Sequence, residues 1–140
     1  MLSGTFEAKM DAKGRTFVPV KMRKDLGLTF MVTKWLDDCL AVYTMEKWNQ
    51  VSAVLNAQPM AKSRETRRFF FSSAAEIELD KQGRMLVPQI LREYAGLTGD
   101  IVIIGAGDWA EIWSAERWKA HNENEELKAN IELAMEELGI

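Results

Sequence analysis

Apolar and charged residues alternate from Phe6 to Met10 and again from Ala75 to Leu79, 69 positions further along the chain. A period of two predicts a strand with one buried face. Each stretch runs into nearly the same nine residues, DAKGRTFVP and DKQGRMLVP. Within them Asp-x-x-Gly predicts a turn, because Asp accepts hydrogen bonds from the backbone two residues on and Gly supplies a positive φ. We therefore expect a strand, a turn and a second strand in both places.

A helix and two more strands are expected after each of these segments. The proline that ends each segment suits the first position of a helix, which predicts the short helices VKMRKDL and QILREYA. Gly27 and Gly96 stand where a left-handed C-cap residue belongs, and Leu28 and Leu97 are placed for the apolar contact that accompanies such a cap. The runs FMVTKW with LAVY, and DIVIIG with AEIW, predict the remaining strands. The order is ββαββ, twice.

The repetition extends beyond the nine residues and indicates an internal duplication. At an offset of 69, ten of the 23 positions from 7 to 29 are identical, namely Glu7, Asp11, Gly14, Arg15, Val18, Pro19, Arg23, Gly27, Leu28 and Thr29. One inserted residue later, Tyr43, Glu46 and Trp48 align with Trp113, Glu116 and Trp118. Each copy has about 45 residues, near the size below which a chain rarely folds alone. We therefore expect the two copies to interlock around one barrel-like core.

Helices are also expected between and after the copies. MEKWNQVSAVLNA has helical spacing, Ser63 is a candidate N-cap of a second helix, and QPM at 58–60 separates the two. Ser114 is a candidate cap for one long acidic helix that ends near Leu138. This helix carries an apolar stripe at three-four spacing, made of Leu127, Ile131, Ala134, Met135 and Leu138. The stripe either packs on its own domain or forms a contact between subunits.

The predicted fold class is therefore α+β, mainly β, in one domain. We expect a first ββαββ unit at 4–47, connecting helices at 48–73, a second unit at 74–118 and a C-terminal helix at 119–140.

Composition adds only broad limits. Nearly half of the residues are apolar, as in core-forming globular proteins. No apolar run approaches the ~20 residues of a transmembrane helix, and MLSGTFEAKMD lacks the basic start and apolar stretch of a signal peptide. The single cysteine, Cys39, has no partner for an internal disulfide. We expect a cytoplasmic protein without a membrane partner.

Charge is unevenly distributed along the chain. Residues 1–72 carry twelve Lys and Arg against seven Asp and Glu, a net of +5, and residues 73–140 carry six against fourteen, a net of −8. This division either places a basic face on an acidic body or serves only solubility.

No catalytic constellation is recognisable. Asp37 and Asp38 fit a hairpin turn, and His121 has no nucleophile near it in the sequence. GAGD at 105–108 lacks the spacing of a phosphate-binding loop and leads into a strand. Cys39 is typical of a buried small apolar residue. One His and one Cys do not make a zinc site. We expect no catalytic residues, no metal, no cofactor and no enzymatic activity.

The duplicated turn is the remaining candidate site. A turn that contains Gly lets the backbone approach a partner, and Arg binds phosphate or a guanine edge with two donors. The pairs Asp11–Arg15 and Asp80–Arg84 also suit a brace across the turn. The candidate residues for binding a polyanion are Lys9, Lys13, Arg15, Arg23, Lys81 and Arg84, and the candidate bracing residues are Asp11, Gly14, Asp80 and Gly83. Arg23 and Arg92 either contact DNA or only brace the fold.

The two D-x-x-G-R-x-x-x-P segments, with LREYAGL at 91–97, VIIGAGD at 102–108 and EIW at 111–113, resemble the MraZ family over essentially the whole chain. The resemblance implies two tandem AbrB-like modules in a swapped-hairpin barrel. It also implies assembly into rings, commonly octamers. Family members bind repeated short motifs in double-stranded promoter DNA upstream of their own gene, and by motif position the resemblance nominates Lys13, Arg15, Lys81 and Arg84 for contact with DNA. They generally repress the division and cell-wall gene cluster that this gene heads, and this places them at the nucleoid.

Two departures from the family pattern qualify what the resemblance implies. Ala8 stands where the first copy of the family is expected to carry histidine. Gln82 stands where the first copy has Lys13, so the first copy is expected to dominate DNA binding. Two alternatives to DNA binding are a ring-forming protein-interaction scaffold and an enzyme that binds a small anion in its Gly-rich turns.

Overall fold

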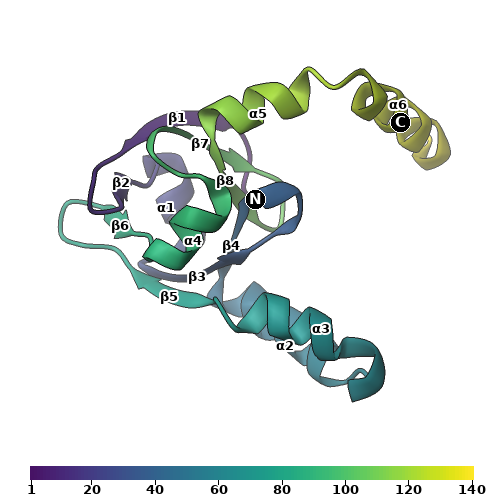
Figure 1. The fold of residues 1–140 in the computed structure, drawn as a ribbon, viewed down its shortest axis with the longest axis horizontal. Coiled ribbons are helices and arrows are strands. Elements are labelled where there is room, and N and C mark those ends of the chain that lie inside the picture. The colour runs from purple at the N-terminus through teal and green to yellow at the C-terminus, as the bar shows by residue number, and fades with distance from the viewer.

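Eight strands and six α-helices follow one another in the computed structural model, which describes residues 1–140 (Figure 1). The first copy contains β1 (Thr5–Met10), β2 (Arg15–Phe17), α1 (Val20–Leu26), β3 (Thr29–Lys34) and β4 (Leu40–Thr44). The connecting helices are α2 (Met45–Asn56) and α3 (Met60–Phe71). The second copy contains β5 (Ala75–Glu78), β6 (Arg84–Leu86), α4 (Gln89–Ala95), β7 (Gly99–Gly105) and β8 (Ala110–Ser114), and is followed by α5 (Ala115–Asn122) and α6 (Glu125–Leu138). The ββαββ order predicted for each copy is confirmed.

The strands of the two copies are exchanged. The large antiparallel sheet has the order β1-β7-β8-β4-β3-β5, and β2 pairs only with β6. When each strand is replaced by its equivalent in the other copy, the order becomes β5-β3-β4-β8-β7-β1, which is the same order read from the opposite edge. The two copies are therefore related by an approximate two-fold axis in this sheet. Three of the pairings that join the copies, β1 with β7, β3 with β5 and β4 with β8, lie in the large sheet. Alone, each copy would keep only one strand pairing, β3 with β4 or β7 with β8.

Both copies contribute to one hydrophobic core. Its largest fully buried side chains are Phe30, Met22, Leu40, Leu91, Ile101, Ile103 and Ile112. Equivalent positions of the two copies are buried in this core. Val18 and Val87 form one such pair, and Met22 and Leu91 form another. The expectation of a shared core is confirmed, and it follows from copies too small to bury enough surface separately.

The ends of the two short helices are not equivalent. Gly96 adopts the expected left-handed conformation, and the N–H of the buried Leu97 donates to the carbonyl of Arg92. Gly27 has a positive φ of 79° but a ψ of −174°, so the chain leaves the helix extended and Leu28 is exposed. The prediction of a left-handed cap with a packed leucine is therefore wrong for the first copy.

The helix α3 begins earlier than predicted, and Ser63 is not its N-cap. The cap residue is Pro59, and Ser63 lies buried one turn inside the helix. Its hydroxyl donates to the carbonyl of Pro59 and accepts from Nε of Arg67. Arg67 also donates to the carbonyls of Leu55, Asn56 and Gln58, which closes the C-terminal end of α2. The break predicted around Pro59 is confirmed.

The predicted single C-terminal helix is instead two helices. Ser114 does cap α5, accepting from the N–H of Arg117, but α5 ends at Asn122. Asn124 is extended (φ −72°, ψ 113°) and caps α6 by accepting from the N–H groups of Glu126 and Leu127. An Asn side chain that bonds to nearby backbone competes with continued helix, which explains the break.

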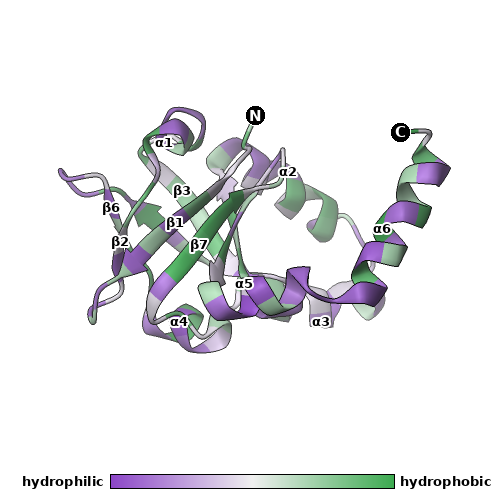
Figure 2. Cartoon of the chain, turned by 90° about the horizontal axis from the view of Figure 1, so that it is seen from above, coloured by the Kyte–Doolittle hydropathy of each residue, from purple (hydrophilic) through white to green (hydrophobic).

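The helix α6 projects from the body of the protein (Figure 1). None of its residues is buried, and Ile131, Met135 and Leu138 of the stripe are 48%, 43% and 73% exposed. Packing of the stripe on its own domain is therefore excluded. The α2–α3 hairpin projects on the same side as α6, whereas β2 and β6 lie at the opposite end (Figure 2). None of the helices combines the length and the apolar character needed to cross a membrane.

Candidate nucleic-acid interface

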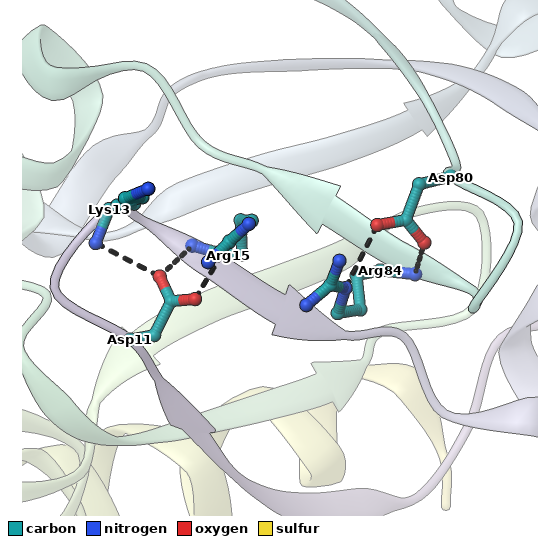
Figure 3. A network of polar contacts seen from close by, with 5 residues as sticks. All are labelled: Asp11, Lys13, Arg15, Asp80 and Arg84. Atoms are coloured by element: carbon teal, nitrogen blue, oxygen red, sulfur yellow. Dashed lines mark hydrogen bonds and ion pairs between the residues drawn. The ribbon is translucent and has the colours of Figure 1, made fainter.

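The first turn, between β1 and β2, is organised by one carboxylate. Oδ1 of Asp11 accepts from the backbone N–H groups of Lys13 and Arg15, both at 2.9 Å. Its Oδ2 accepts from Nε of Arg15 at 2.8 Å. Figure 3 shows this arrangement. Asp11 thus shapes the turn and orients the arginine that follows it.

The second turn repeats this geometry. Oδ1 of Asp80 accepts from the N–H groups of Gln82 and Arg84, both at 2.9 Å, and its Oδ2 accepts from Nε of Arg84 at 2.9 Å (Figure 3). In both turns the aspartate occupies only Nε, so the two terminal nitrogens of each guanidinium have no partner within the chain.

The hydrogen bonds to the two aspartates stabilise their ionised forms. The N–H of Arg15, with the further donors of the turn, lowers the pKa of Asp11 from 3.8 to about 2. The N–H of Arg84 and its neighbours lower the pKa of Asp80 in the same way. Both carboxylates are therefore charged at neutral pH. Because the ion pairs are exposed, they contribute more to the orientation of the arginines than to stability.

The two arginines lie on the outer face of the β2–β6 ribbon. The register pairs Arg15 with Leu86, Thr16 with Met85 and Phe17 with Arg84. Thr16 and Met85 point into the protein and are buried, so the other four side chains share the outer face. The arginine side chains are 36% and 27% exposed, and they lie side by side over the ribbon in Figure 3. The fold thus brings together two cations that are 69 residues apart in sequence.

The glycines of the turns face arginines of the opposite copy. Gly14 has φ +90°, and a Cβ added there would lie 2.5 Å from Nε of Arg92 and 2.8 Å from the carbonyl oxygen of Val87. Gly83 has φ +80°, and a Cβ there would lie 2.4 Å from the guanidinium carbon of Arg23. Both positions require glycine because of their backbone conformation and because an arginine from the other copy occupies the space.

Arg23 and Arg92 are half-buried beneath the turns. Nε of Arg23 donates to the carbonyl of Val18 at 2.8 Å, and Nε of Arg92 donates to the carbonyl of Val87 at 2.9 Å. Their guanidinium groups pack against the turns of the opposite copy, and neither forms an ion pair with a carboxylate. These structural contacts are enough to explain why both copies have an arginine at this position, without any contact with DNA.

The candidate lysines differ in their surroundings. Lys13 and Lys81 are exposed in the two turns, so each turn offers one free cation. Lys9 lies on β1, outside the ribbon, where its ammonium pairs with Asp100 at 3.1 Å. The structure therefore places Lys13, Arg15, Lys81 and Arg84 on the ribbon and its turns, and pairs Lys9 with a carboxylate of the large sheet.

Two residues of the outer face were overlooked in the sequence. Phe17 and Leu86 are 55% and 54% exposed beside the arginines. An alternating strand places residues 15 and 17 on one face and Thr16 on the other. Alternation thus groups Phe17 with Arg15 and Leu86 with Arg84, but a three-residue strand does not itself show which of its two faces is exposed.

The other polar candidates have structural surroundings. Asp37 and Asp38 lie in the β3–β4 hairpin turn with φ of 64° and 57°, and His121 packs against Trp113, with ring centroids 4.8 Å apart. Cys39 is fully buried, its thiol donates to the carbonyl of Leu36, and burial raises its pKa. No group of three or more His, Cys, Asp or Glu side chains is arranged to hold a metal.

Comparison with known proteins agrees with this duplicated architecture. A family model described as "MraZ protein, putative antitoxin-like" matches the chain twice, at residues 1–69 and 70–136. The relative from Heliobacterium modesticaldum is 51% identical over 88% of this chain and 87% of its own length. The relative from Acetivibrio thermocellus is 44% identical over the full length of both chains, and that from Syntrophomonas wolfei is 42% identical over 94% and 96%.

Each of these relatives is named Transcriptional regulator MraZ. The names describe regulators and no enzyme, which agrees with the expectation that this chain is not an enzyme. Two family matches that cover most of the sequence, together with relatives more than 40% identical over nearly its whole length, show that the chain belongs to the MraZ family.

Proposed function

We propose that this chain is a transcriptional regulator that binds double-stranded DNA sequence-specifically through the outer face of the β2–β6 ribbon. One observation supports this more than any other. Arg15 and Arg84 are oriented side by side on an exposed face, and each keeps two terminal guanidinium nitrogens free. Arginine presented in this way pairs with O6 and N7 of guanine in the major groove.

The shape of the ribbon suits the major groove. A two-stranded antiparallel ribbon fits a groove about 12 Å wide. The turns at its ends carry Lys13 and Lys81, whose exposed ammonium groups are suited to phosphate oxygens on either side. In this arrangement arginines read bases and lysines set the register. The first copy dominates, because Arg15 is the more exposed arginine.

The target we propose is a set of short direct repeats in the promoter upstream of the chain's own gene. Binding there represses the division and cell-wall gene cluster and places the protein at the nucleoid. The exchanged strands support a swapped-hairpin barrel of the AbrB-like type. Each protomer offers few phosphate contacts. Linked protomers on spaced repeats gain affinity by about 10² to 10⁴ without any new contact.

Binding to the upstream DNA and to a scrambled fragment tests the proposal, by fluorescence anisotropy over a salt series. Wild type is expected to prefer the upstream fragment. Arg15→Ala and Arg84→Ala are expected to weaken that binding by roughly 5- to 150-fold, the range for removing one bidentate pairing with a base. Lys13→Ala is expected to reduce the salt slope by about one while leaving sequence preference intact.

Lys119→Ala is the matched control, because it removes one exposed cation on α5, away from the ribbon. It is expected to bind like wild type. Equal, weak binding of wild type to both fragments would contradict sequence-specific regulation and favour the protein-interaction scaffold. A loss of affinity for Lys119→Ala as large as that for Arg15→Ala would show that only total charge matters.

We also infer that the protein assembles into a ring, with eight copies favoured by the family resemblance. Helix α6 carries five Glu and one Lys, a net of −4, beside its exposed apolar stripe. Helix α3 carries four Lys and Arg and one Glu, a net of +3, and Met60 and Val54 are exposed at the tip of the same hairpin. Within one chain α6 and that hairpin are separate projections of the body (Figure 1). Docking of α6 onto the α2–α3 hairpin of the next copy is head-to-tail, and such contacts form a ring when the rotation from copy to copy closes.

Light scattering after size-exclusion chromatography tests this contact. Glu132→Lys with Glu136→Lys, or Arg64→Glu with Arg68→Glu, should dissociate the assembly, and combining the four should restore it. A monomeric wild type would contradict assembly altogether. An oligomer whose mass neither reversal changes would place the contact elsewhere on the surface.

A further inference from the structure

The outer face of the β2–β6 ribbon carries an apolar pair as well as an arginine pair. Phe17 and Leu86 are more than half exposed, although both belong to residue types that normally pack inside. The ribbon does not need them for its core contacts, since Thr16 and Met85 on the inner face are almost fully buried. Their exposure leaves both side chains available to a partner outside the chain.

The register places the apolar pair and the arginine pair in alternation. Phe17 lies opposite Arg84, and Leu86 lies opposite Arg15. We refer to these four residues as the ribbon quartet. Cβ atoms of directly opposed residues are about 4.5–5.5 Å apart in antiparallel strands. Each guanidinium thus has an exposed apolar side chain beside it, and the two halves of the quartet are related by the approximate two-fold relation of the copies.

Guanine acceptors and thymine methyl groups lie on the same floor of the major groove. The C5 methyl of thymine is the apolar group that a base presents there, and apolar side chains such as Phe contact it. Successive bases along a strand are about 3.4 Å apart. The two spacings differ by only about one to two ångströms, which the length of the arginine side chain covers, so an arginine on a guanine leaves the neighbouring apolar side chain within reach of an adjacent thymine.

We propose that Phe17 and Leu86 contact thymine methyl groups next to the guanines bound by Arg15 and Arg84. This inference rests on the proposed function, because it requires the ribbon to enter the groove. The recognised element is then duplex DNA in which thymine adjoins guanine. Phe17 and Leu86 are specificity residues, and they discriminate against cytosine, which has no methyl group at that position.

A protein partner fits this face less well than DNA. A stable protein interface buries about 800 Å² on each partner, and two isolated apolar side chains are a small part of that. The same face carries two guanidinium groups, and the turns at its ends carry Lys13 and Lys81. A cationic surface with a small apolar centre suits a polyanion with methyl groups between its phosphates.

Replacement of thymine by uracil in the upstream fragment tests the inference, because it removes only the methyl group. Wild type is expected to bind the uracil fragment about fourfold more weakly for each methyl group that Phe17 or Leu86 would otherwise cover. Phe17→Ala and Leu86→Ala are each expected to bind the thymine fragment more weakly and to show a smaller difference between the two fragments. Arg15→Ala is the matched control on the same face, and it should bind more weakly while keeping that difference.

The failures of the two proposals are distinguishable. No preference of wild type for the upstream fragment over a scrambled one would refute the proposed function itself. A clear preference, combined with equal binding of thymine and uracil fragments, would overturn this inference and leave the regulator standing. Unchanged DNA binding by Phe17→Ala and Leu86→Ala, with a lower assembly mass, would overturn it in favour of a contact between copies. The wild-type comparison needs no variant, so misfolding of a variant does not obscure it.

Discussion

Replacement of Gly14 by alanine is expected to destabilise the protein by more than a change in backbone conformation alone. The positive φ of +90° costs a non-glycine residue about 1–2 kcal/mol. The new Cβ would also lie 2.5 Å from Nε of Arg92 and displace it from the carbonyl of Val87. A hydrogen bond from a charged group is worth about 1.5–3 kcal/mol. The sum is a loss of about 2.5–5 kcal/mol in the free energy of unfolding.

Gly99→Ala is the matched control for this change. Gly99 also has a positive φ, +59°, but a Cβ there meets nothing within 4 Å. It should cost only the backbone contribution of about 1–2 kcal/mol. Urea unfolding at a fixed protein concentration measures both, and the excess for Gly14→Ala corresponds to about 1 M in the midpoint for a typical denaturant dependence.

A second substitution, at Arg92, separates the cost of the backbone conformation at Gly14 from the cost of the contact with Arg92. In an Arg92→Ala background the contact with the arginine is gone and only the contact with the Val87 carbonyl oxygen remains, so Gly14→Ala should cost less than it does in the wild-type background. This double-mutant cycle isolates the interaction between the copies. Equal destabilisation by Gly14→Ala and Gly99→Ala in the wild-type background would refute the reasoning, and so would full additivity of Gly14→Ala with Arg92→Ala.

Thr16, Asp11 and Cys39 each give a further prediction. Thr16→Val should stabilise the protein by about 1 kcal/mol in urea unfolding, because the buried hydroxyl has no hydrogen-bond partner; destabilisation would mean that the hydroxyl is satisfied. The ion pair of Asp11 should strengthen folding fully above about pH 4 and cease to do so as the pH falls through its folded pKa of about 2. An NMR titration of the Asp11 carboxyl tests this, with Asp11→Asn as control, and a midpoint near 3.8 would contradict it. Cys39 should react with a thiol reagent only after unfolding in urea, since it is fully buried and its pKa is raised by burial; rapid native-state labelling would contradict this.

Local chemistry made the strands, turns and short helices predictable. Asp11 and Gly14 specify a turn through contacts within five residues, and the alternation around β1 requires no knowledge of the rest of the chain. Ser63 was misassigned because a serine with helical residues after it satisfies the N-cap pattern, whereas the preceding Pro59 starts the helix one turn earlier. The break at Asn124 was missed because helical spacing continues across it.

The candidate site was predictable only in part, because its geometry arises between copies. Sequence identity marked Arg23 and Arg92 as equivalent, but only the fold shows that each packs against a distant glycine of the opposite copy, Gly83 and Gly14 respectively. Phe17 was overlooked because no local rule distinguishes an exposed face of a three-residue strand from a buried one. The exposure of α6 likewise depends on tertiary structure, since the same stripe would serve a buried helix.

The reciprocal contacts explain why the chain carries the same turn twice. Gly14 makes room for Arg92, and its carbonyl accepts from the N–H of Val87; Gly83 makes room for Arg23 and accepts from the N–H of Val18. The two turns together therefore hold β2 against β6. A substitution that breaks the contacts of either turn should displace both Arg15 and Arg84. Substitutions at the glycines should change stability and DNA binding together. Substitutions on the outer face, at Arg15 or Phe17, should change DNA binding far more than stability, because those side chains contribute little to the contacts between β2 and β6.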